Sequence, residues 1–395
     1  MIIYNARIFN PDGSYTEKGF VKEEKGKIAA VGSMAELTEK PSDGDLDAEG
    51  LTLYPAFIDA HCHIGMFENG IGFEGDDGNE ETDPSTPHLR AIDAVNPLDY
   101  CFKEAAEGGI GTVITGMGSA NPIGGTFIAM KTAGSKMVDK RIIKDPCSMK
   151  LALGENPKTV YNDREETPMT RMATAAVIRE QLYKAKRYME DYAEYEATKG
   201  TDDEVSKPDY DIKCEALIPL LKREIKAHIH CHRADDIFTA VRLSKEFNLD
   251  YVLIHATEGS IIAEELGEEK AQCVVGPLFC DRCKPELRNQ TISNAARLTE
   301  QGAEVAICTD HPENPIQYLP VTAGLAVRGG MSPEEAIKAI TINPARICGI
   351  ADRVGSIEKG KDADFVLFRG SPFDVTSKPE AVFIDGKLIK EQDNL

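Results

Sequence analysis

Two histidines, His61 and His63, lie one residue apart at the end of the apolar run LYPAFIDAHCHIG. In a β-strand, residues i and i+2 point to the same face of the sheet, so these two imidazoles can converge on one point. Neutral imidazole is a common ligand for zinc and similar metals. An isolated H-x-H pair also arises by chance, so a metal site needs support from the rest of the chain.

Other apolar runs also end on residues that bind metals. KAHIHCHRADDI carries His228, His230 and His232 with period 2, DYVLIHATEG ends its run on His255, and EVAICTDHP ends its run on Asp310. Short runs rich in Val, Ile, Leu and Ala that stop at a polar residue are typical of buried parallel strands with a functional site at their C-terminal ends. Six of the eight histidines lie at these strand ends, which favours one shared site over six separate core residues.

One further run, SMKLALGENPK, ends on an acidic residue. Its apolar stretch ends at Glu155 and is stopped by Pro157. Glu155 is therefore a further candidate to join the histidines.

The order of these residues, H-x-H, then an acidic or lysine bridge, then His, His and Asp, resembles the ligand order of the metal-dependent amidohydrolase superfamily. The flanks are similar too, because MIIYNARIFNPDGSYTEKGFVKEEKGKIAAVGS, VGSIEKGKDADFVLFRGSPF and VFIDGKLIK look like the strands of its small domain. The resemblance covers nearly all 395 residues. It implies an α/β fold, a (β/α)8 TIM barrel with a small discontinuous β-sandwich domain made from both termini.

Carried over residue by residue, the resemblance implies a set of metal ligands: His61, His63, Glu155, His230, His255 and Asp310. Asp310 would also act as general base, and His255 or His232 would assist the carbonyl oxygen. His230 is preferred among the three histidines of its strand because IHC fits the family's apolar-His-small pattern. His232 then contacts substrate, and His228 is a buried barrel residue.

The bridging ligand has two candidates. Many members of the superfamily use a carboxylated lysine, for which Lys150 lies in a suitable strand. Glu155 ends the same run, as in N-acetylglucosamine-6-phosphate deacetylases, where a glutamate supplies the ligand. We favour Glu155 because a carboxylate binds metal without modification.

The strand pattern divides the chain. Residues 1–54 and 349–395 are predicted to form the small domain, and residues 55–348 the barrel domain. Barrel strands are expected near 56–61, 111–115, 127–131, 149–154, 226–231, 251–255, 272–276 and 304–309, alternating with helices, which implies a parallel sheet. The Ala-rich stretch 170–199 has no Gly or Pro and is predicted to be a long helix.

Composition excludes some functions. With 45 basic and 66 acidic residues the formal charge is −21, so neither nucleic acid nor an anionic membrane is an expected partner. No apolar run reaches the roughly 18 residues that a transmembrane helix requires. The ten cysteines lack the spacing of a secreted disulfide scaffold, and the N-terminus lacks a signal-peptide pattern, so we expect a cytoplasmic protein.

The leading hypothesis is a hydrolase that uses a metal-activated water to cleave an amide or cyclic amide C–N bond other than a peptide bond, as in imidazolonepropionase-like members. The alternatives are a metal-dependent dipeptidase of the same superfamily and a non-catalytic scaffold on the same fold. The cofactor is expected to be one or two divalent ions, zinc first, with Mn, Fe or Ni as options. The substrate is a small molecule, and a homo-oligomer is compatible with the resemblance. Candidate substrate-binding residues are His232, Arg233, His88, Arg171 and Lys284.

Overall fold

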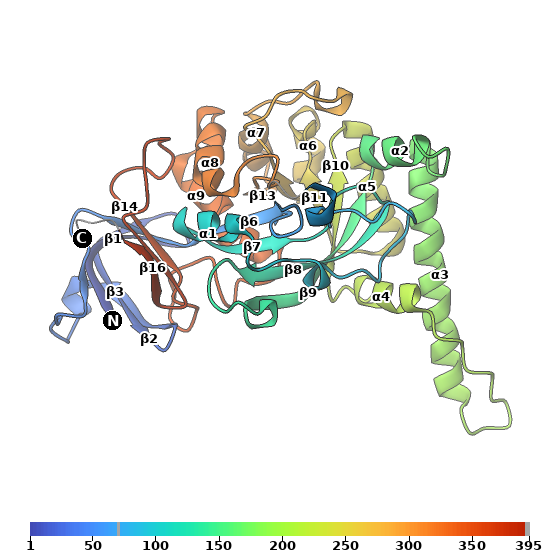
Figure 1. Ribbon diagram of the computed structural model, residues 1–395, viewed down its shortest axis with the longest axis horizontal. Helices are drawn as coiled ribbons and strands as arrows, with labels where there is room; N and C mark the ends of the chain where they lie inside the picture. Colours follow the sequence, from blue (N-terminus) through green and yellow to red (C-terminus); the bar gives the residue numbers. More distant parts are fainter. Residues whose placement is uncertain (69–71, 392–395) are drawn as a thin grey trace.

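The computed structural model describes residues 1–68 and 72–391, which contain two β-sheets (Figure 1). The larger sheet is a nearly closed barrel, in which the strands lie side by side in chain order: β6 (Phe57–Cys62), β7 (Ile110–Thr115), β8 (Ile123–Lys131), β9 (Ile142–Ala152), β10 (Lys226–Cys231), β11 (Tyr251–His255), β12 (Gln272–Val275) and β13 (Glu304–Ile307). The expected eight-stranded barrel is therefore confirmed.

The first and last barrel strands meet through a few hydrogen bonds. The Thr309 backbone N–H donates to the Asp59 carboxylate at 3.1 Å. Just beyond, Asp310 N–H donates to His61 O at 3.2 Å and His63 N–H donates to His311 O at 2.8 Å. These bonds bring the C-terminal ends of β6 and β13 together, and with them the residues that follow those strands.

One part of the barrel differs from the expected alternation of strands and helices. Strand β8 runs antiparallel to both β7 and β9, and no α-helix lies between these three strands in the described chain. The reason is that β7 and β8 are joined by a short connection, residues 116–122. A parallel crossover needs about a dozen residues or more, whereas a short loop can only join antiparallel neighbours.

The second sheet combines both ends of the chain, as predicted. Its strands follow the order β16 (Lys387–Glu391), β15 (Ala381–Ile384), β14 (Phe365–Phe368), β5 (Thr52–Pro55), β1 (Ile2–Phe9), β2 (Tyr15–Glu24) and β3 (Lys27–Ser33), with β4 (Leu46–Asp47) beside β1. Ile3, Ile8, Leu53 and Phe365 pack in a core of its own. The boundaries at residues 54 and 349 stay a prediction.

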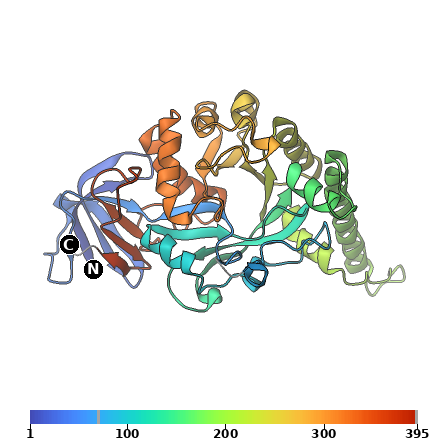
Figure 2. The same cartoon turned by 45° about the horizontal axis from the view of Figure 1, so that its top comes forward.

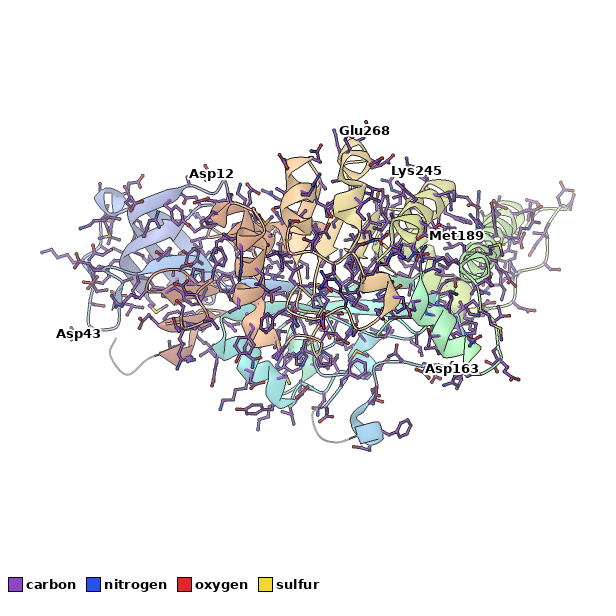
Figure 3. All side chains as sticks on the ribbon, turned by 90° about the horizontal axis from the view of Figure 1, so that it is seen from above. Asp12, Asp43, Asp163, Met189, Lys245 and Glu268 are labelled. Carbon is purple, nitrogen blue, oxygen red and sulfur yellow. The ribbon has the colours of Figure 1, made fainter. Side chains whose placement is uncertain are left out.

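Helices surround the barrel (Figure 2). They are α1 (Tyr100–Glu107), α2 (Glu155–Asn162), α3 (Arg171–Thr198), α4 (Ile212–Leu221), α5 (Ala234–Phe247), α6 (Ala263–Glu268), α7 (Asn294–Glu300), α8 (Leu319–Arg328), α9 (Pro333–Ala339) and α10 (Ile342–Ile347). The long helix α3 is confirmed, and the Thr170 hydroxyl caps it by accepting from Ala173 N–H. Seen from above, Asp43 near the small sheet and Met189 of α3 lie at opposite ends of the molecule (Figure 3). In the described part of the chain, no helix combines the length and apolarity needed to cross a bilayer.

A buried ion cluster joins the barrel to the second sheet. The Lys131 ammonium at the end of β8 contacts the carboxylates of Asp364, Asp362 (2.9 Å) and Asp385 (3.3 Å). Burial alone would lower the pKa of Lys131, but the three aspartates raise it. Lys131, Asp362 and Asp364 are almost inaccessible to solvent. Asp362 is also paired with Lys27 and Arg353, whereas Asp364 is paired with Lys131.

We expect Lys131→Met to destabilise the protein by about 3–5 kcal/mol, because it takes the cationic partner away from the buried Asp364 carboxylate. Denaturant unfolding monitored by circular dichroism would measure the loss. Lys136→Met, which removes an exposed lysine after the same strand, is the control and should have little effect. An equal, small loss in both variants would mean that other groups, not Lys131, compensate Asp364.

Candidate active site

The C-terminal ends of the barrel strands bring five of the predicted residues together. His61 lies one residue before the end of β6, His63 follows that strand, His255 ends β11, Asp310 follows β13 and His230 lies near the end of β10. The Asp310 Oδ1 atom is 3.2 Å from His63 Nε2 and 3.6 Å from His61 Nε2. One potential ligand atom from each of His61, His255 and Asp310 falls within 4.8 Å of the others, and so does one from each of His230, His232 and His255. His255 therefore stands between two groups of ligands.

The backbone is strained where two of these side chains enter the site. His255 has φ 70° and Asp310 has φ 55°, both in the left-handed region. For residues other than glycine, such conformations cost of order 1–3 kcal/mol each and persist only where the surrounding structure holds them. His255 is the last residue of β11 and Asp310 lies after the end of β13, and both side chains belong to the group of ligand atoms with His61.

Hydrogen bonds at Nδ1 orient two of the imidazoles. His63 Nδ1 lies 2.7 Å from the carbonyl oxygen of Gly116, and His255 Nδ1 lies 2.6 Å from that of Gly276. A carbonyl oxygen only accepts, so Nδ1 carries the proton in both rings and the Nε2 lone pair is left free. Hydrogen bonds of this kind are the usual means of presenting histidine to a metal.

The buried polar atoms fit a divalent metal. The described residues supply no hydrogen-bond partner for His230 Nε2, His232 Nε2 or Asp310 Oδ1, although all are shielded from water. Two ligands of a tetrahedral zinc, each at 2.0–2.1 Å, lie about 3.4 Å apart. The separations of 3.2 and 3.6 Å between Asp310 and the two histidines bracket this value.

Burial keeps these histidines neutral. It lowers the pKa of His255 to about 4 and the pKa values of His61, His230 and His232 well below the usual range. Burial would raise the pKa of Asp310, but His255, His63 and Lys150 lower it, so the carboxylate is ionised. Neutral imidazole and ionised carboxylate are the forms that bind metal.

Lys150 lies inside this cluster. Its Nζ atom is 3.3 Å from His61 Nε2, and the side chain is fully buried. Burial lowers its pKa to about 8, which leaves a substantial neutral fraction near neutral pH. In the parallel pairing of β9 with β10, Lys150 is level with His228, nearer the N-terminal end than His230. His228 belongs to neither group of ligand atoms.

A cavity of about 420 Å³ opens onto the cluster. His63, His230, His232, His255 and Asp310 form part of its wall, as does the predicted substrate residue Lys284. The Lys284 ammonium donates to Asn156 Oδ1 at 2.8 Å. Of the five predicted substrate-binding residues, His232 and Lys284 therefore face this cavity.

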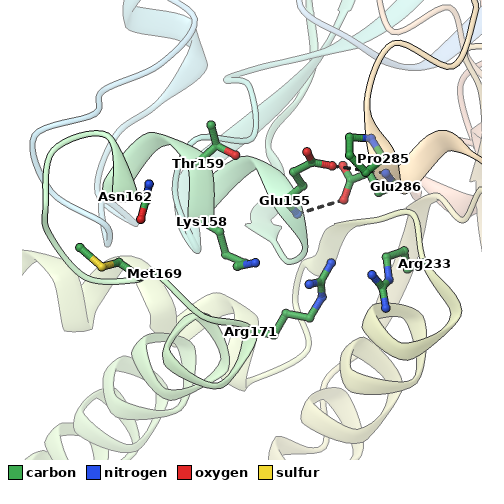
Figure 4. Close-up of a pocket in the computed structure, with 9 residues that line it drawn as sticks. All are labelled: Glu155, Lys158, Thr159, Asn162, Met169, Arg171, Arg233, Pro285 and Glu286. Carbon is green, nitrogen blue, oxygen red and sulfur yellow. Dashed lines mark hydrogen bonds between the residues drawn. The ribbon is translucent and has the colours of Figure 1, made fainter.

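Three predicted residues lie instead around a separate cavity of about 340 Å³, shown in Figure 4: Glu155, Arg171 and Arg233. Arg171 Nε donates to both carboxylate oxygens of Asp236 at 3.0 Å, and Arg233 is paired with Asp235. The remaining predicted substrate-binding residue, His88, lines neither of these two cavities.

The structure does not bring Glu155 into the ligand cluster. Glu155 begins α2, after β9 has ended, and its Oε2 accepts from the backbone N–H of Glu286 at 3.3 Å. We therefore expect Glu155→Gln to keep the metal content of the wild type, as elemental analysis of protein purified without chelator would measure. Loss of an ion in this variant would instead make Glu155 the bridge.

Three residues at the site were not predicted from the sequence. Ser119 Oγ lies 2.9 Å from His230 Nδ1, and Thr257 Oγ1 lies 2.7 Å from His232 Nδ1. The buried side chain of Glu286 also reaches the cluster, from the loop after β12. A hydroxyl two residues after His255 could have been noticed at the strand end, whereas Ser119 and Glu286 lie in loops with no recognisable pattern.

Comparison with known proteins shows what the chain as a whole is similar to. Residues 52–389 match the Amidohydrolase family. Over 391 residues the chain is 30% identical to the amidohydrolase tasK of Hapsidospora irregularis, an alignment that covers 93% of this chain but only 39% of that protein. It is 26% identical over 404 residues to an imidazolonepropionase of Phocaeicola vulgatus, covering 93% of this chain and 92% of the relative.

A solved structure is similar throughout. The crystal structure of an amidohydrolase from Thermotoga maritima MSB8 superimposes with a TM-score of 0.92 at 42% sequence identity. The match covers 99% of this chain and all of the other, so both sheets are shared.

Proposed function

The chain belongs to the amidohydrolase family, and we propose that it is a metal-dependent hydrolase that cleaves a non-peptide C–N bond in an amide or cyclic amide. The observation that carries this proposal is the convergence of neutral histidines and an ionised aspartate on the wall of one cavity, with the buried Lys150 against His61. Such a set combines metal ligands with a proton acceptor, which is what hydrolysis of an unactivated amide needs.

We assign the metal ligands by position. His61, His63 and Asp310 would hold one ion, and His230 and His255 a second. Imidazole and carboxylate donors suit zinc best, with Mn, Fe and Ni compatible. When bound, divalent ions at these residues lower the pKa of water and polarise the substrate carbonyl.

Lys150 replaces Glu155 as our candidate for the bridge. Its neutral amine nitrogen can add to carbon dioxide, which forms one N–C bond, releases one proton and yields a carbamate anion. The lowered pKa favours this step because only the unprotonated amine has the lone pair that reacts. The carbamate would supply a carboxylate between the two groups of ligands, where Asp310 is the acidic side chain of the described chain that pairs with the His61 imidazole.

The remaining steps belong to the protein's own groups. Asp310 accepts a proton from the attacking water at its carboxylate and later returns it to the leaving nitrogen. His232 and His255 are stacked with ring centroids 4.6 Å apart, so either can assist the carbonyl oxygen of the substrate. Lys284 and Asn156, on the cavity wall, would orient a polar or anionic part of the substrate.

A substrate panel tests this function. Wild-type protein loaded with zinc or manganese should hydrolyse at least one compound among cyclic amides and N-acyl amino acids, and a chelator should remove the activity. Cleavage confined to dipeptides would favour the dipeptidase alternative. Metal-loaded protein with no activity on any member would favour the non-catalytic scaffold.

A further inference from the structure

Glu286 places a carboxylate beside two of the histidines without being part of the assigned ligand set. It lies in the short 3-10 helix Pro285–Leu287, in the loop between β12 and α7, and its side chain is 1% exposed. Its Oε1 atom is 3.5 Å from His232 Nε2 and 3.9 Å from His230 Nε2. These three atoms surround a small volume at the edge of the main cavity.

The two ring nitrogens that face Glu286 are unpartnered. His230 Nε2 and His232 Nε2 are buried and make no hydrogen bond with the described residues, and Glu286 Oε1 is paired with Lys284 alone. The other ring nitrogens are occupied, since Nδ1 of His230 contacts Ser119 and Nδ1 of His232 contacts Thr257. Two buried ring nitrogens without hydrogen bonds are costly, and a metal ion between them and the carboxylate would remove that cost.

The separations suit a metal ion. Ligand atoms of a tetrahedral zinc lie about 3.4 Å apart. The 3.5 Å between Glu286 and His232 matches this value, and the 3.9 Å to His230 needs only a small adjustment. The Lys284 ammonium, 2.8 Å from Oε1, supplies positive charge from the open side of the cavity but is partly exposed and attached to a flexible side chain.

The rest of the structure holds Glu286 in this position. Its Oε2 atom accepts from the backbone N–H of Glu155 at 2.9 Å, at the start of α2 (Figure 4). Gly154, with φ 85°, allows this close approach, because a Cβ there would lie 2.8 Å from Oε2. One carboxylate oxygen is thus fixed to the backbone, and the other is directed at the histidines.

We propose that Glu286 and His232 join His230 and His255 as ligands of the second metal ion, so that His232 binds this ion and the part played at the substrate carbonyl falls to His255. The assignment rests on the proposed function for the presence of metal, but it adds two protein ligands and one negative charge to the second position. It also ties the loop between β12 and α7, which forms one wall of the cavity, to the bound ion.

Cobalt titration tests this assignment without relying on catalysis. Co²⁺ is added to chelator-treated protein, and its visible absorption and the bound metal per chain are recorded. Wild type should bind two ions in distinguishable steps. In Glu286→Gln the weaker step should lose at least about tenfold in affinity, the lower end of what removal of even an indirect metal contact costs. Glu155→Gln, the partner of Glu286 on α2, is the matched control and should titrate like wild type.

His232→Gln provides a second variant in case Glu286→Gln does not fold, which circular dichroism would reveal. It should weaken the same step. Unchanged Co²⁺ affinity and spectrum in both variants would overturn the assignment and leave the proposed function intact. A wild type that binds a single ion and still hydrolyses amides would overturn it too, whereas a wild type that binds none would overturn both.

Discussion

Asp310→Asn is expected to lower kcat by at least about 10³-fold, within the range that general acid–base groups contribute. The amide has nearly the same shape as the carboxylate, but it neither accepts a proton from water nor carries the negative charge that faces His63 and His61. Steady-state kinetics on the best substrate from the panel would measure the loss. Metal analysis and thermal unfolding of the same preparation would show whether the site is otherwise intact.

Asp281→Asn is a suitable control for this substitution. Asp281 is exposed and lies in the loop after β12, so its change removes one nearby negative charge without touching the cluster. It should leave kcat unchanged. If Asp310→Asn retained wild-type kcat in a folded, metal-loaded protein, Asp310 would not be the general base and another group in the cavity would have that role.

Lys150→Ala is expected to have the second large effect. It removes the nitrogen that would carry the carbamate, 3.3 Å from His61 Nε2, and with it the bridge between the two groups of ligands. We expect metal affinity to fall by about 10- to 100-fold or more and activity to fall with it. Elemental analysis after dialysis against metal-free buffer, followed by kinetics, would measure both.

Two features make this result specific to a carbamate. A short carboxylate such as acetate or propionate fits the space left by the lysine chain, so it should restore part of the metal binding and activity of Lys150→Ala. Lys144→Met is the control from the same strand, because Lys144 points to the Cys348 carbonyl instead of the cluster. Full metal content in Lys150→Ala without any carboxylate would exclude Lys150 as the bridge.

The pH dependence of reconstitution follows from the same residue. Burial lowers the pKa of Lys150 to about 8, so at pH 7 far more of it is unprotonated than of a free lysine. The neutral fraction of the amine reaches half at the pKa and approaches its maximum roughly one pH unit above it. Recovery of activity by chelator-treated protein in bicarbonate and metal should therefore accelerate as pH rises through 8 and level off above about pH 9.

Local patterns in the sequence were sufficient for much of this fold. Apolar runs that stop at His61, His255 and Asp310 indicate buried strands with polar ends, because strand burial and the period of two are properties of consecutive residues. The long helix, predicted over residues 170–199 and found at 171–198, also follows from a local feature. The pairing of both chain ends in one small sheet was predicted from the family resemblance and not from the local pattern. The antiparallel direction of β8 depends on the short loop 116–122, and the predicted alternation of strands and helices did not take the length of this loop into account.

The residue that bridges the two groups of ligands could not be chosen from local sequence patterns. Lys150 and Glu155 lie five residues apart in one run, and either could end a strand. Strand β9 stops at Ala152, so Lys150 remains on the inner face of the sheet while Glu155 passes to the start of α2 and contacts another loop. Where a strand ends depends on the pairing available from its neighbours, which is a property of the closed barrel.

The sequence by itself therefore determined which strands carry the chemistry, since strand ends and residue types are local. Only the tertiary structure decided which side chains meet. Glu286 and His232 are far apart in the chain and approach within 3.5 Å because β10 and β12 are held in one barrel and the loop after β12 folds over its mouth. Such contacts result from sheet closure and loop packing, which no window of consecutive residues encodes.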